Sequence, residues 1–560
     1  MDSFWTGTVA DVRGSWVRPA SVRGLFAVPL MVAIVLGVTS VGAAPVLAQG
    51  VPSAAASPPG TGLAWGDNAE SQLGDGTTTN SSTPVTVDVP ADTTITAVAA
   101  GQGHSLAVTS AGTVLAWGAN SSGQLGDGTT TPRSTPVAVD LPAGTTITAV
   151  AAGDRHSLAV TSTGTVLAWG LNVTGQLYDG TTTSSSTPIV VDLPVGTTVT
   201  AVAAGNAHSL ALTSAGTVLA WGANSSGQLG DGTTTPRSTP VAVDLPVGTT
   251  ITTIAASSSS HSLAVTSTGT MLAWGANFTG QLGDGTITNR STPVAVDLPA
   301  GTTVTAVATG SGHSLAVTSA GTMLAWGGNG SGQLGDGSTT SSSTPVAVDL
   351  PAGTTVTAVA GGAGHSLALT STGTMLAWGF NTSGQLGDGT TSNRSIPIAT
   401  DLPADTTITA IAGGSFHSLA IVPSTSTTTL QVSPPNPTPD QPVTLTATVT
   451  CTGSTPTGTM TYLEDTTILG TEPLSGNPTA TATLTVTRLT PGTHHIQARY
   501  NGDNNCPTST SDSTTVTVPK PTIPVTGTSL PTILAAGSLL TLTGTALTLA
   551  THRRRPTHRA

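Results

Sequence analysis

Residues 113–164 read TVLAWGANSSGQLGDGTTTPRSTPVAVDLPAGTTITAVAAGDRHSLAVTSTG, and this unit of 52 residues decides the fold. Its tryptophan recurs along the chain at steps of 52 or 53 residues, and its histidine recurs in step with it. Self-similarity at such a period indicates an architecture of repeated supersecondary units. The repeated residues are Trp65, Trp117, Trp169, Trp221, Trp274, Trp326 and Trp378, with His104, His156, His208, His261, His313, His365 and His417.

Each unit contains four short β-rich runs. In the copy above they are Pro136–Asp140, Thr145–Ala151, His156–Thr161 and Thr165–Trp169. Leu-Pro-Ala-Gly separates the first two and Ser-Thr-Gly the last two, and both are typical of turns. Four antiparallel strands, repeated seven times, predict a seven-bladed β-propeller.

The phase of the repeats predicts how the ring closes. They begin within a unit, at Leu63 to Gly66, and end within one, at His417 to Ala420. The seventh blade therefore needs both ends of the repeat region, so residues 62–66 should pair with residues 417–422. Such pairing leaves no exposed strand edge at the closure.

The motif WGxNxxGQLGDG, followed by GxGHSLA, resembles the regulator of chromosome condensation repeat family over residues 61–422. Members of that family include a nucleotide exchange factor for a nuclear GTPase and a secreted β-lactamase inhibitor. The resemblance implies a propeller that binds or regulates other proteins. Uniform units leave no room for an inserted exchange wedge, which argues against the nuclear role.

Three recurring motifs look chemical but favour structural roles. Gly-His-Ser-Leu-Ala enters a strand, whereas a nucleophile elbow needs a strand-to-helix turn. Histidines on different blades lie too far apart to share one metal ion. The Asp-Gly pairs form turns and lack the several acidic ligands of a calcium loop. No catalytic, cofactor-binding or metal site is predicted. The turn aspartates are Asp75, Asp127, Asp179, Asp231, Asp284, Asp336 and Asp388.

The N-terminal segment is typical of a secretory signal. Arg13, Arg18 and Arg23 precede an apolar run from Leu25 to Val41. Small residues before position 49 favour cleavage after Ala48. A signal anchor that is not removed is the alternative.

The C-terminal segment resembles the LPXTG sorting signal of Gram-positive surface proteins. The motif is Ile523, Pro524, Val525, Thr526 and Gly527, with Ile in place of the usual Leu. An apolar stretch at 530–550, long enough to span a bilayer, and an arginine-rich tail follow. The resemblance implies that sortase cleaves between Thr526 and Gly527 and links the protein to peptidoglycan. A plain transmembrane anchor is the alternative, and either places the bulk of the chain outside the cell.

A second module follows the repeats. Val443–Val449, Gly458–Leu463, Ala480–Thr487, His494–Tyr500 and Thr514–Val518 are the strands predicted within it. Their spacing predicts a β-sandwich. The sequences PTGTMTYLED and LTPGTHHIQARYNGD resemble bacterial immunoglobulin-like repeats, which implies a stalk or spacer. Cys451 and Cys506 are the only cysteines, and export favours a disulfide between them over two separate thiols.

The charge balance bears on partners. Residues 49–526 hold eight basic and 25 acidic residues, a difference of −17. Such a surface repels phosphate backbones, so no nucleic-acid partner is expected. Contact with a membrane is expected only through the C-terminal segment before sorting.

The predicted ligand-binding face carries the long loops, because the seven copies differ mainly there. Aromatic residues and arginine dominate binding energies, although neutral drift in loops also produces variation. Apolar candidates are Leu171, Tyr178, Phe278, Phe380 and Phe416, and charged ones are Arg133, Arg155, Arg237, Arg290 and Arg394. The predicted function is a cell-surface scaffold that binds an extracellular protein or glycan. The alternative is a regulator or inhibitor of an extracellular enzyme.

The sequence therefore predicts an all-β protein: a seven-bladed propeller and an immunoglobulin-like sandwich between an N-terminal signal peptide and a C-terminal membrane-spanning sorting helix. The predicted order is a signal peptide at 1–48, a linker at 49–60, the propeller at 61–422, a linker at 423–429, the sandwich at 430–518, a linker at 519–529, the transmembrane segment at 530–550 and a basic cytoplasmic tail at 551–560.

Overall fold

The computed structural model describes residues 59–178 and 180–522. All regular structure in these ranges is β, in 36 strands. No helix within them has the length and hydropathy to cross a membrane. The predicted signal peptide, sorting motif, transmembrane segment and basic tail lie outside the described residues.

Strands β1 to β28 form seven groups of four, and each group is an antiparallel blade. The innermost strands are β3 (Ile95–Ala100), β7 (Ile147–Ala152), β11 (Val199–Ala204), β15 (Ile251–Ala256), β19 (Val304–Thr309), β23 (Val356–Gly361) and β27 (Ala410–Gly413). The second strands are β4 (His104–Thr109), β8 (His156–Thr161), β12 (His208–Thr213), β16 (His261–Thr266), β20 (His313–Thr318), β24 (His365–Thr370) and β28 (His417–Pro423).

The third strand of each blade carries the tryptophan, and the fourth is outermost. The third strands are β1 (Gly60–Gly66), β5 (Val114–Gly118), β9 (Val166–Gly170), β13 (Val218–Gly222), β17 (Met271–Gly275), β21 (Met323–Gly327) and β25 (Met375–Gly379). The outer strands are β2 (Ser81–Thr86), β6 (Arg133–Ala138), β10 (Ser185–Val190), β14 (Arg237–Ala242), β18 (Arg290–Ala295), β22 (Ser342–Ala347) and β26 (Arg394–Ala399).

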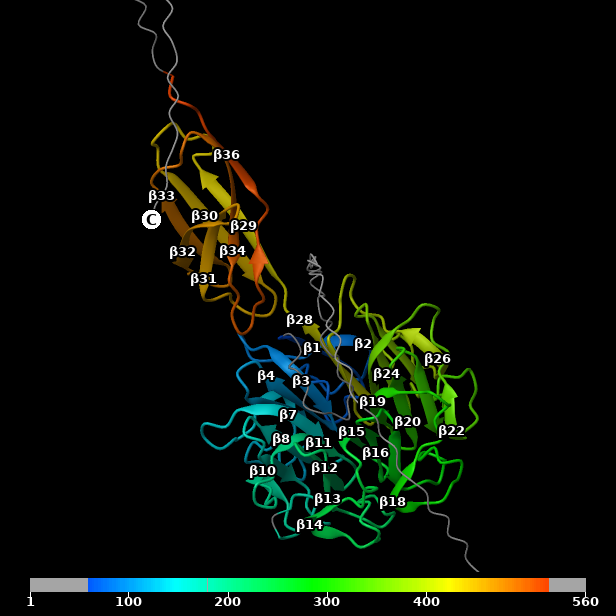
Figure 1. Ribbon diagram of the computed structural model, residues 1–560. Coiled ribbons are helices and arrows are strands. Elements are labelled where there is room, and N and C mark those ends of the chain that lie inside the picture. The colour runs from blue at the N-terminus through cyan, green and yellow to red at the C-terminus, as the bar shows by residue number, and fades with distance from the viewer. Residues whose placement is uncertain (1–58, 179, 523–560) are drawn as a thin grey trace, which may run out of the picture. The chain divides into compact units, whose positions relative to one another are not determined.

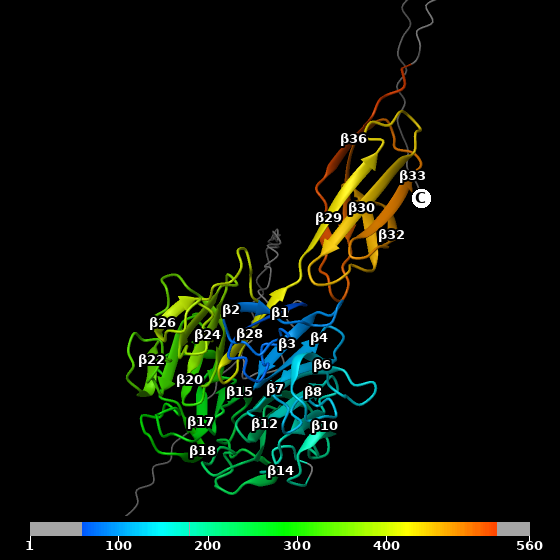
Figure 2. The same cartoon turned by 180° about the vertical axis from the view of Figure 1, so that it is seen from behind.

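The ring closes as the phase of the repeats predicts. Strand β28 pairs with β1 in an antiparallel register from Gly60 opposite Pro423 to Gly66 opposite His417. Figures 1 and 2 show these two strands, from opposite ends of the repeat region, lying side by side. Around the propeller the colour passes from blue through green to yellow and meets blue again (Figure 1). The seventh blade is therefore β27, β28, β1 and β2.

The hydrophobic core of the propeller lies between neighbouring blades. All seven repeat tryptophans are fully buried and belong to this core. Each indole packs in a cluster that joins two repeats. Trp169, for example, shares one with Val108 and Leu125 of the preceding blade and with Ile147 at the start of β7 in its own blade. Large aromatic burial compensates for the many small residues of these strands.

The second module is a sandwich of two sheets, visible in Figure 2. Its strands are β29 (Ser426–Ser433), β30 (Val443–Cys451), β31 (Thr459–Glu464), β32 (Thr467–Pro473), β33 (Ala480–Val486), β34 (Gly492–Tyr500), β35 (Ser509–Thr510) and β36 (Thr514–Val518). One sheet has the order β29-β30-β33. The other has the order β32-β31-β34-β35, with β36 also on β34. The predicted linker at 423–429 is wrong in part, because residues 426–429 pair with β30.

A disulfide joins Cys451 and Cys506, as predicted, with 6.0 Å between their Cα atoms. Cys506 is buried within the core of the sandwich, beside strands β30 and β34. The bond therefore ties the end of β30 to the segment between β34 and β35.

Candidate binding face and axial cavity

One end of the propeller, here called the loop face, carries two kinds of connection from every blade. In the first complete repeat these are the junction between β3 and β4 and the long loop between β5 and β6. The backbone N–H of Ala119 in the loop donates to the carbonyl of Gly103 in the junction at 2.8 Å. The turns Leu-Pro-Ala-Gly and Ser-x-Gly lie at the opposite end of the strands. The loops and junctions therefore share one face, as the chain direction predicts.

Each long loop is built around one buried asparagine. The Asn120 amide nitrogen donates to Asp127 Oδ1 at 3.1 Å, and its oxygen accepts from the Leu125 N–H at 3.0 Å. These bonds hold the loop in one conformation, although its sequence varies between copies. The sequence analysis did not single out this residue, although WGxN occurs in all seven repeats. The asparagines are Asn68, Asn120, Asn172, Asn224, Asn277, Asn329 and Asn381.

Four of the five predicted charged candidates form an ion pair with an aspartate of their own loop. Arg133 pairs with Asp127 of its own loop at 2.7 Å, and the same pair recurs in three other repeats. Desolvation alone would raise the pKa of Asp127, but hydrogen bonds from Thr129 and Arg133 outweigh it and lower that pKa. These four arginines therefore have a structural role in their loops, and a role in binding stays a prediction for them. The fifth, Arg155, is exposed in the junction between β7 and β8.

The histidines and tryptophans connect blades. His104 Nε2 lies 3.0 Å from Ser157 Oγ of the next repeat, and that hydroxyl donates to the carbonyl of Gln124. Trp169 Nε1 donates to the same carbonyl at 2.9 Å. Burial, assisted by the neighbouring histidines, lowers the pKa of His104 to about 3, so the ring is neutral. This confirms hydrogen bonding as the role of the repeated histidine.

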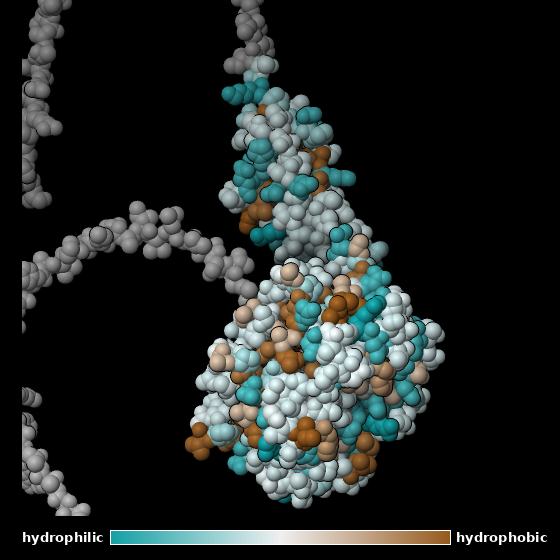
Figure 3. Space-filling view, turned by 90° about the vertical axis from the view of Figure 1, so that its right-hand side faces the viewer, coloured by the Kyte–Doolittle hydropathy of each residue, from teal (hydrophilic) through white to brown (hydrophobic). Residues whose placement is uncertain are grey.

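The predicted apolar candidates differ in exposure. Phe278 is 70% exposed and Phe416 40% exposed, so both present aromatic surface on the loop face. Leu171, Tyr178 and Phe380 are half-buried rather than exposed. Tyr178 leans on Trp221 of the next blade, with ring centroids 6.4 Å apart. Phe380 packs at a tilt against Phe416, with centroids 5.9 Å apart. The side of the propeller that Figure 3 shows is mostly pale, with brown and teal groups scattered over it.

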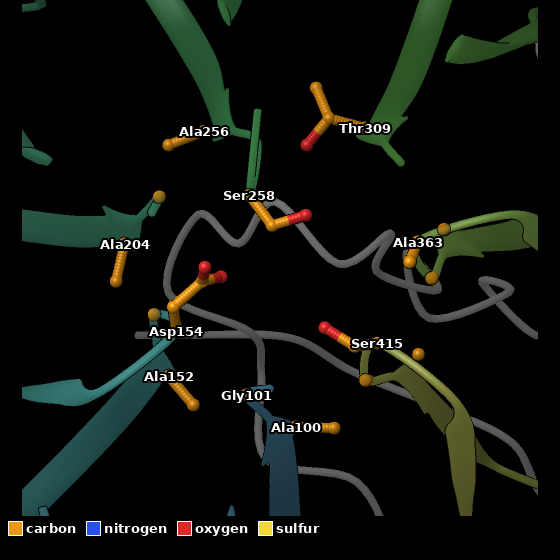
Figure 4. A pocket seen from close by; sticks show the side chains of 16 residues that line it. Ala100, Gly101, Ala152, Asp154, Ala204, Ala256, Ser258, Thr309, Ala363 and Ser415 are labelled. Carbon is orange, nitrogen blue, oxygen red and sulfur yellow. The ribbon is translucent and has the colours of Figure 1, made fainter. Parts of the chain in front are cut away.

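A cavity of about 60 Å³ opens on the axis, where the seven inner strands end. Its wall consists of small residues, including Ala100, Ala152 and Ala204, and one carboxylate, Asp154. Figure 4 shows Asp154, Ser258 and Ser415 reaching toward its middle from three blades. Sequence analysis missed Asp154. The one feature of the sequence that could have indicated it is variation between copies. The residue after the Gly or Ser that follows each inner strand is Asp154 in one copy and a different residue type in most others.

Metal binding has no support within the described ranges, which hold no group of three or more His, Cys, Asp or Glu placed to share an ion. The predicted sortase site, Thr526 and Gly527, and the motif residues Ile523, Pro524 and Val525 lie beyond residue 522 and outside the described part of the chain.

Comparison with known proteins identifies both modules. Residues 61–420 match the model of the RCC1-like domain, and residues 430–519 match that of the bacterial Ig-like domain, group 3. The ultraviolet-B receptor UVR8 of Arabidopsis thaliana is 33% identical over 325 residues, which are 58% of this chain and 74% of that protein. The human E3 ubiquitin-protein ligase HERC2 is 33% identical over 364 residues, which are 64% of this chain but only 8% of that protein.

Solved structures share the propeller fold. Yeast RCC1 (Prp20), solved with Kap60, aligns with a TM-score of 0.60 at 23% identity, covering 70% of this chain and 96% of that one. Human WBSCR16 aligns with a TM-score of 0.59 at 24% identity, covering 65% of this chain and 99% of that one.

Proposed function

Because the chain belongs to the family of RCC1-like domain proteins, we propose that it is a binding scaffold displayed outside the cell. Its propeller engages an extracellular protein or glycan through the loop face, and the Ig-like module acts as a stalk. One observation carries this proposal: Phe278 and Phe416, on the loop face, are the two exposed aromatic residues among the large exposed hydrophobic residues of the described propeller. Exposed aromatic groups are the usual anchors of protein interfaces.

The relatives support binding or regulation as the class of role. One is named as a receptor and another as a ubiquitin-protein ligase. The match covers only a small part of the ligase, so its activity is not transferred to this chain. The rigid loops also support a binding role, because preorganised loops lose little entropy when they bind.

Display at the surface rests on the two ends of the sequence. The basic and apolar N-terminal segment favours export, and the motif ending at Thr526 and Gly527 favours attachment to peptidoglycan. Intact cells test this. Detergent should leave the protein in the wall fraction, whereas muramidase should release it. Thr526→Ala should move the protein out of the muramidase-released fraction. Complete extraction of the parent by detergent would instead establish a plain membrane anchor.

A binding experiment tests the role of the loop face. The full chain is used to capture partners from matrix proteins, glycans and secreted enzymes, and the affinity of each is measured. Alanine at Phe278, Phe380 and Phe416 together should weaken binding by about tenfold or more. Alanine at Val195 and Val247, two exposed valines on the opposite turns, is the matched control. Unchanged affinity in the folded triple variant would reject the loop face. A captured enzyme that loses activity would favour the regulatory alternative.

A further inference from the structure

The axial cavity differs from the rest of the propeller because its lining breaks the repeat. Each inner strand is followed by a Gly or Ser and then by one residue that differs between copies. Four of these seven variable residues line the cavity: Asp154, Ser258, Ala363 and Ser415. Their backbones are linked in part by hydrogen bonds, such as that from the Asp154 N–H to the Gly205 carbonyl and from the Ser415 N–H to the Gly101 carbonyl. In chain order the seven are Gln102, Asp154, Asn206, Ser258, Ser311, Ala363 and Ser415.

Among the described residues, Asp154 is the only ionisable one that lines this cavity. Its side chain is half-buried, and the described residues give its carboxylate one side-chain hydrogen bond, from the Asn206 amide. A carboxylate has about four acceptor positions, so most of them are open toward the cavity. Arg155 is exposed and forms no ion pair within the described ranges, although its charge acts on Asp154. In the described part of the chain the carboxylate therefore has no ion-pair partner, although the charge of Arg155 reaches it.

The chemistry of the wall selects the class of ligand. Calcium needs six to eight oxygen ligands, commonly from several carboxylates, and the cavity offers one carboxylate. An alkylammonium group needs only three acceptors. Asp154, Ser258 and Ser415 present oxygens from three sides (Figure 4), and walls of alanine and glycine admit a slender alkyl chain.

The overall charge fits a cation as well. Residues 61–422 hold 19 acidic residues and five arginines, a balance of −14. Such a field draws cationic groups toward the surface. We propose that the axial cavity binds an alkylammonium group, as carried by a lysine side chain of the partner, with Asp154 as its counter-ion. This inference rests on the proposed function, because it places the partner on the loop face.

The test uses the full chain and the peptide acetyl-Gly-Gly-Lys-Gly-Gly-amide, titrated by calorimetry or saturation-transfer NMR. The Asp154→Asn variant should bind the peptide about tenfold more weakly. The Asp154→Ser variant should do the same, and it will fold because serine already occupies this position in three repeats. Asp140→Asn removes the same charge from an exposed site after β6, so it should change affinity by no more than about twofold.

The same peptide with norleucine in place of lysine should not bind. Equal losses in Asp154→Asn and Asp140→Asn would overturn the proposal, because they would indicate diffuse attraction. Absence of peptide binding, or equal binding of the norleucine peptide, would overturn it too. Putrescine serves as a second probe. Tighter binding of the peptide would identify a protein lysine as the source, and tighter binding of putrescine a free amine.

The outcome is separable from that of the proposed function. If the peptide fails to bind but alanine at Phe278, Phe380 and Phe416 abolishes partner binding, the loop face is the interface and the cavity is not a lysine site. If the peptide binds in a manner that needs Asp154 but the triple variant binds its partner normally, the cavity site stands and the aromatic interface fails.

Discussion

His417 of the last repeat and Ser105 of the first are 312 residues apart in sequence, and His417 Nε2 lies 3.0 Å from Ser105 Oγ. The Ser105 hydroxyl donates to the Gln72 carbonyl at 2.8 Å, so the imidazole must donate to the hydroxyl. The same bond joins the two blades at each of the six internal junctions, as between His104 and Ser157. The closing junction therefore repeats the internal junctions atom for atom, and these bonds form a complete circle.

Removing the closing hydroxyl should cost as much stability as removing an internal one. Ser105→Ala leaves the buried Nε2–H of His417 without its acceptor, which should lower the free energy of unfolding by about 1–3 kcal/mol. Ser157→Ala does the same to His104 and is the matched control. Guanidinium unfolding of the full chain measures both. If Ser105→Ala left the free energy of unfolding unchanged while Ser157→Ala lowered it, the bond between His417 and Ser105 would not stabilise the closure of the ring.

The circle of histidines should make the propeller sensitive to mild acid. Burial, reinforced in four of them by neighbouring histidines, lowers the pKa of all seven to about 3 or 4. Below their ordinary pKa of 6.5 the unfolded chain binds protons that the folded propeller does not. Stability therefore falls as the pH drops. Each histidine should contribute about 1.4 kcal/mol between about pH 7.5 and 5.5, on the order of 10 kcal/mol for seven.

The Ig-like module provides the control for that prediction within the same chain. Burial alone would lower the pKa of His494, but hydrogen bonds to Glu464 and the Thr490 carbonyl outweigh it and raise that pKa. A raised pKa gives stability that is present at low pH and is lost as the pH rises. Calorimetry should thus show the propeller transition falling on acidification while the Ig-like transition holds. Two transitions that fall in parallel would contradict this account.

Two glycines of one repeat should differ in how much stability is lost when each is replaced by alanine, because the backbone of a neighbouring strand lies close to only one of them. Gly222 has φ +99°, and a Cβ there would lie 2.4 Å from the Ala207 carbonyl oxygen. Gly248 has φ +80°, but a Cβ there meets nothing within 4 Å. Gly248→Ala should cost about 1–2 kcal/mol from the backbone conformation alone. Gly222→Ala should cost more than about 3 kcal/mol. Equal unfolding free energies would show that the strands separate freely.

The propeller was predictable because its signal is repeated seven times. The run His156–Thr161 matches β8 at both ends, whereas the outer run was expected at Pro136–Asp140 and β6 lies at Arg133–Ala138. The inner run was expected at Thr145–Ala151, and β7 lies at Ile147–Ala152. The outer strand begins where Arg133 pairs with Asp127, and that contact has no counterpart in local periodicity.

Composition also hides strands. Residues 426–429 are Ser and Thr, as in a linker, but they pair with β30 because Thr428 is turned into the sandwich and buried. Strand β32, at Thr467–Pro473, was not anticipated either, since a partly exposed strand shows little apolar alternation. The cavity residue Asp154 was also hard to predict from the sequence. Asp154 is one substitution among seven copies, and only the fold reveals that these positions meet around one cavity.

The cavity carboxylate should lower the stability of the propeller at neutral pH. Desolvation raises the pKa of Asp154 to about 6, despite the opposing effects of Asn206 and Arg155. The folded protein therefore holds this proton more tightly than the unfolded chain does. The resulting stabilisation is present at low pH and is lost as the pH rises through about 6. At pH 7.5 Asp154→Asn should accordingly raise the free energy of unfolding, on the order of 1–3 kcal/mol.

Three observations would distinguish this effect from a general change of charge. Asp140→Asn, at an exposed position, should alter stability by less than about 0.5 kcal/mol. The advantage of Asp154→Asn should narrow between pH 7.5 and 5.5, because the parent carboxylate becomes protonated. A variant less stable than the parent at pH 7.5 would show instead that the bond from Asn206 makes Asp154 a structural residue. A more stable variant that loses the lysine peptide would mean that the carboxylate is kept for binding at the expense of stability.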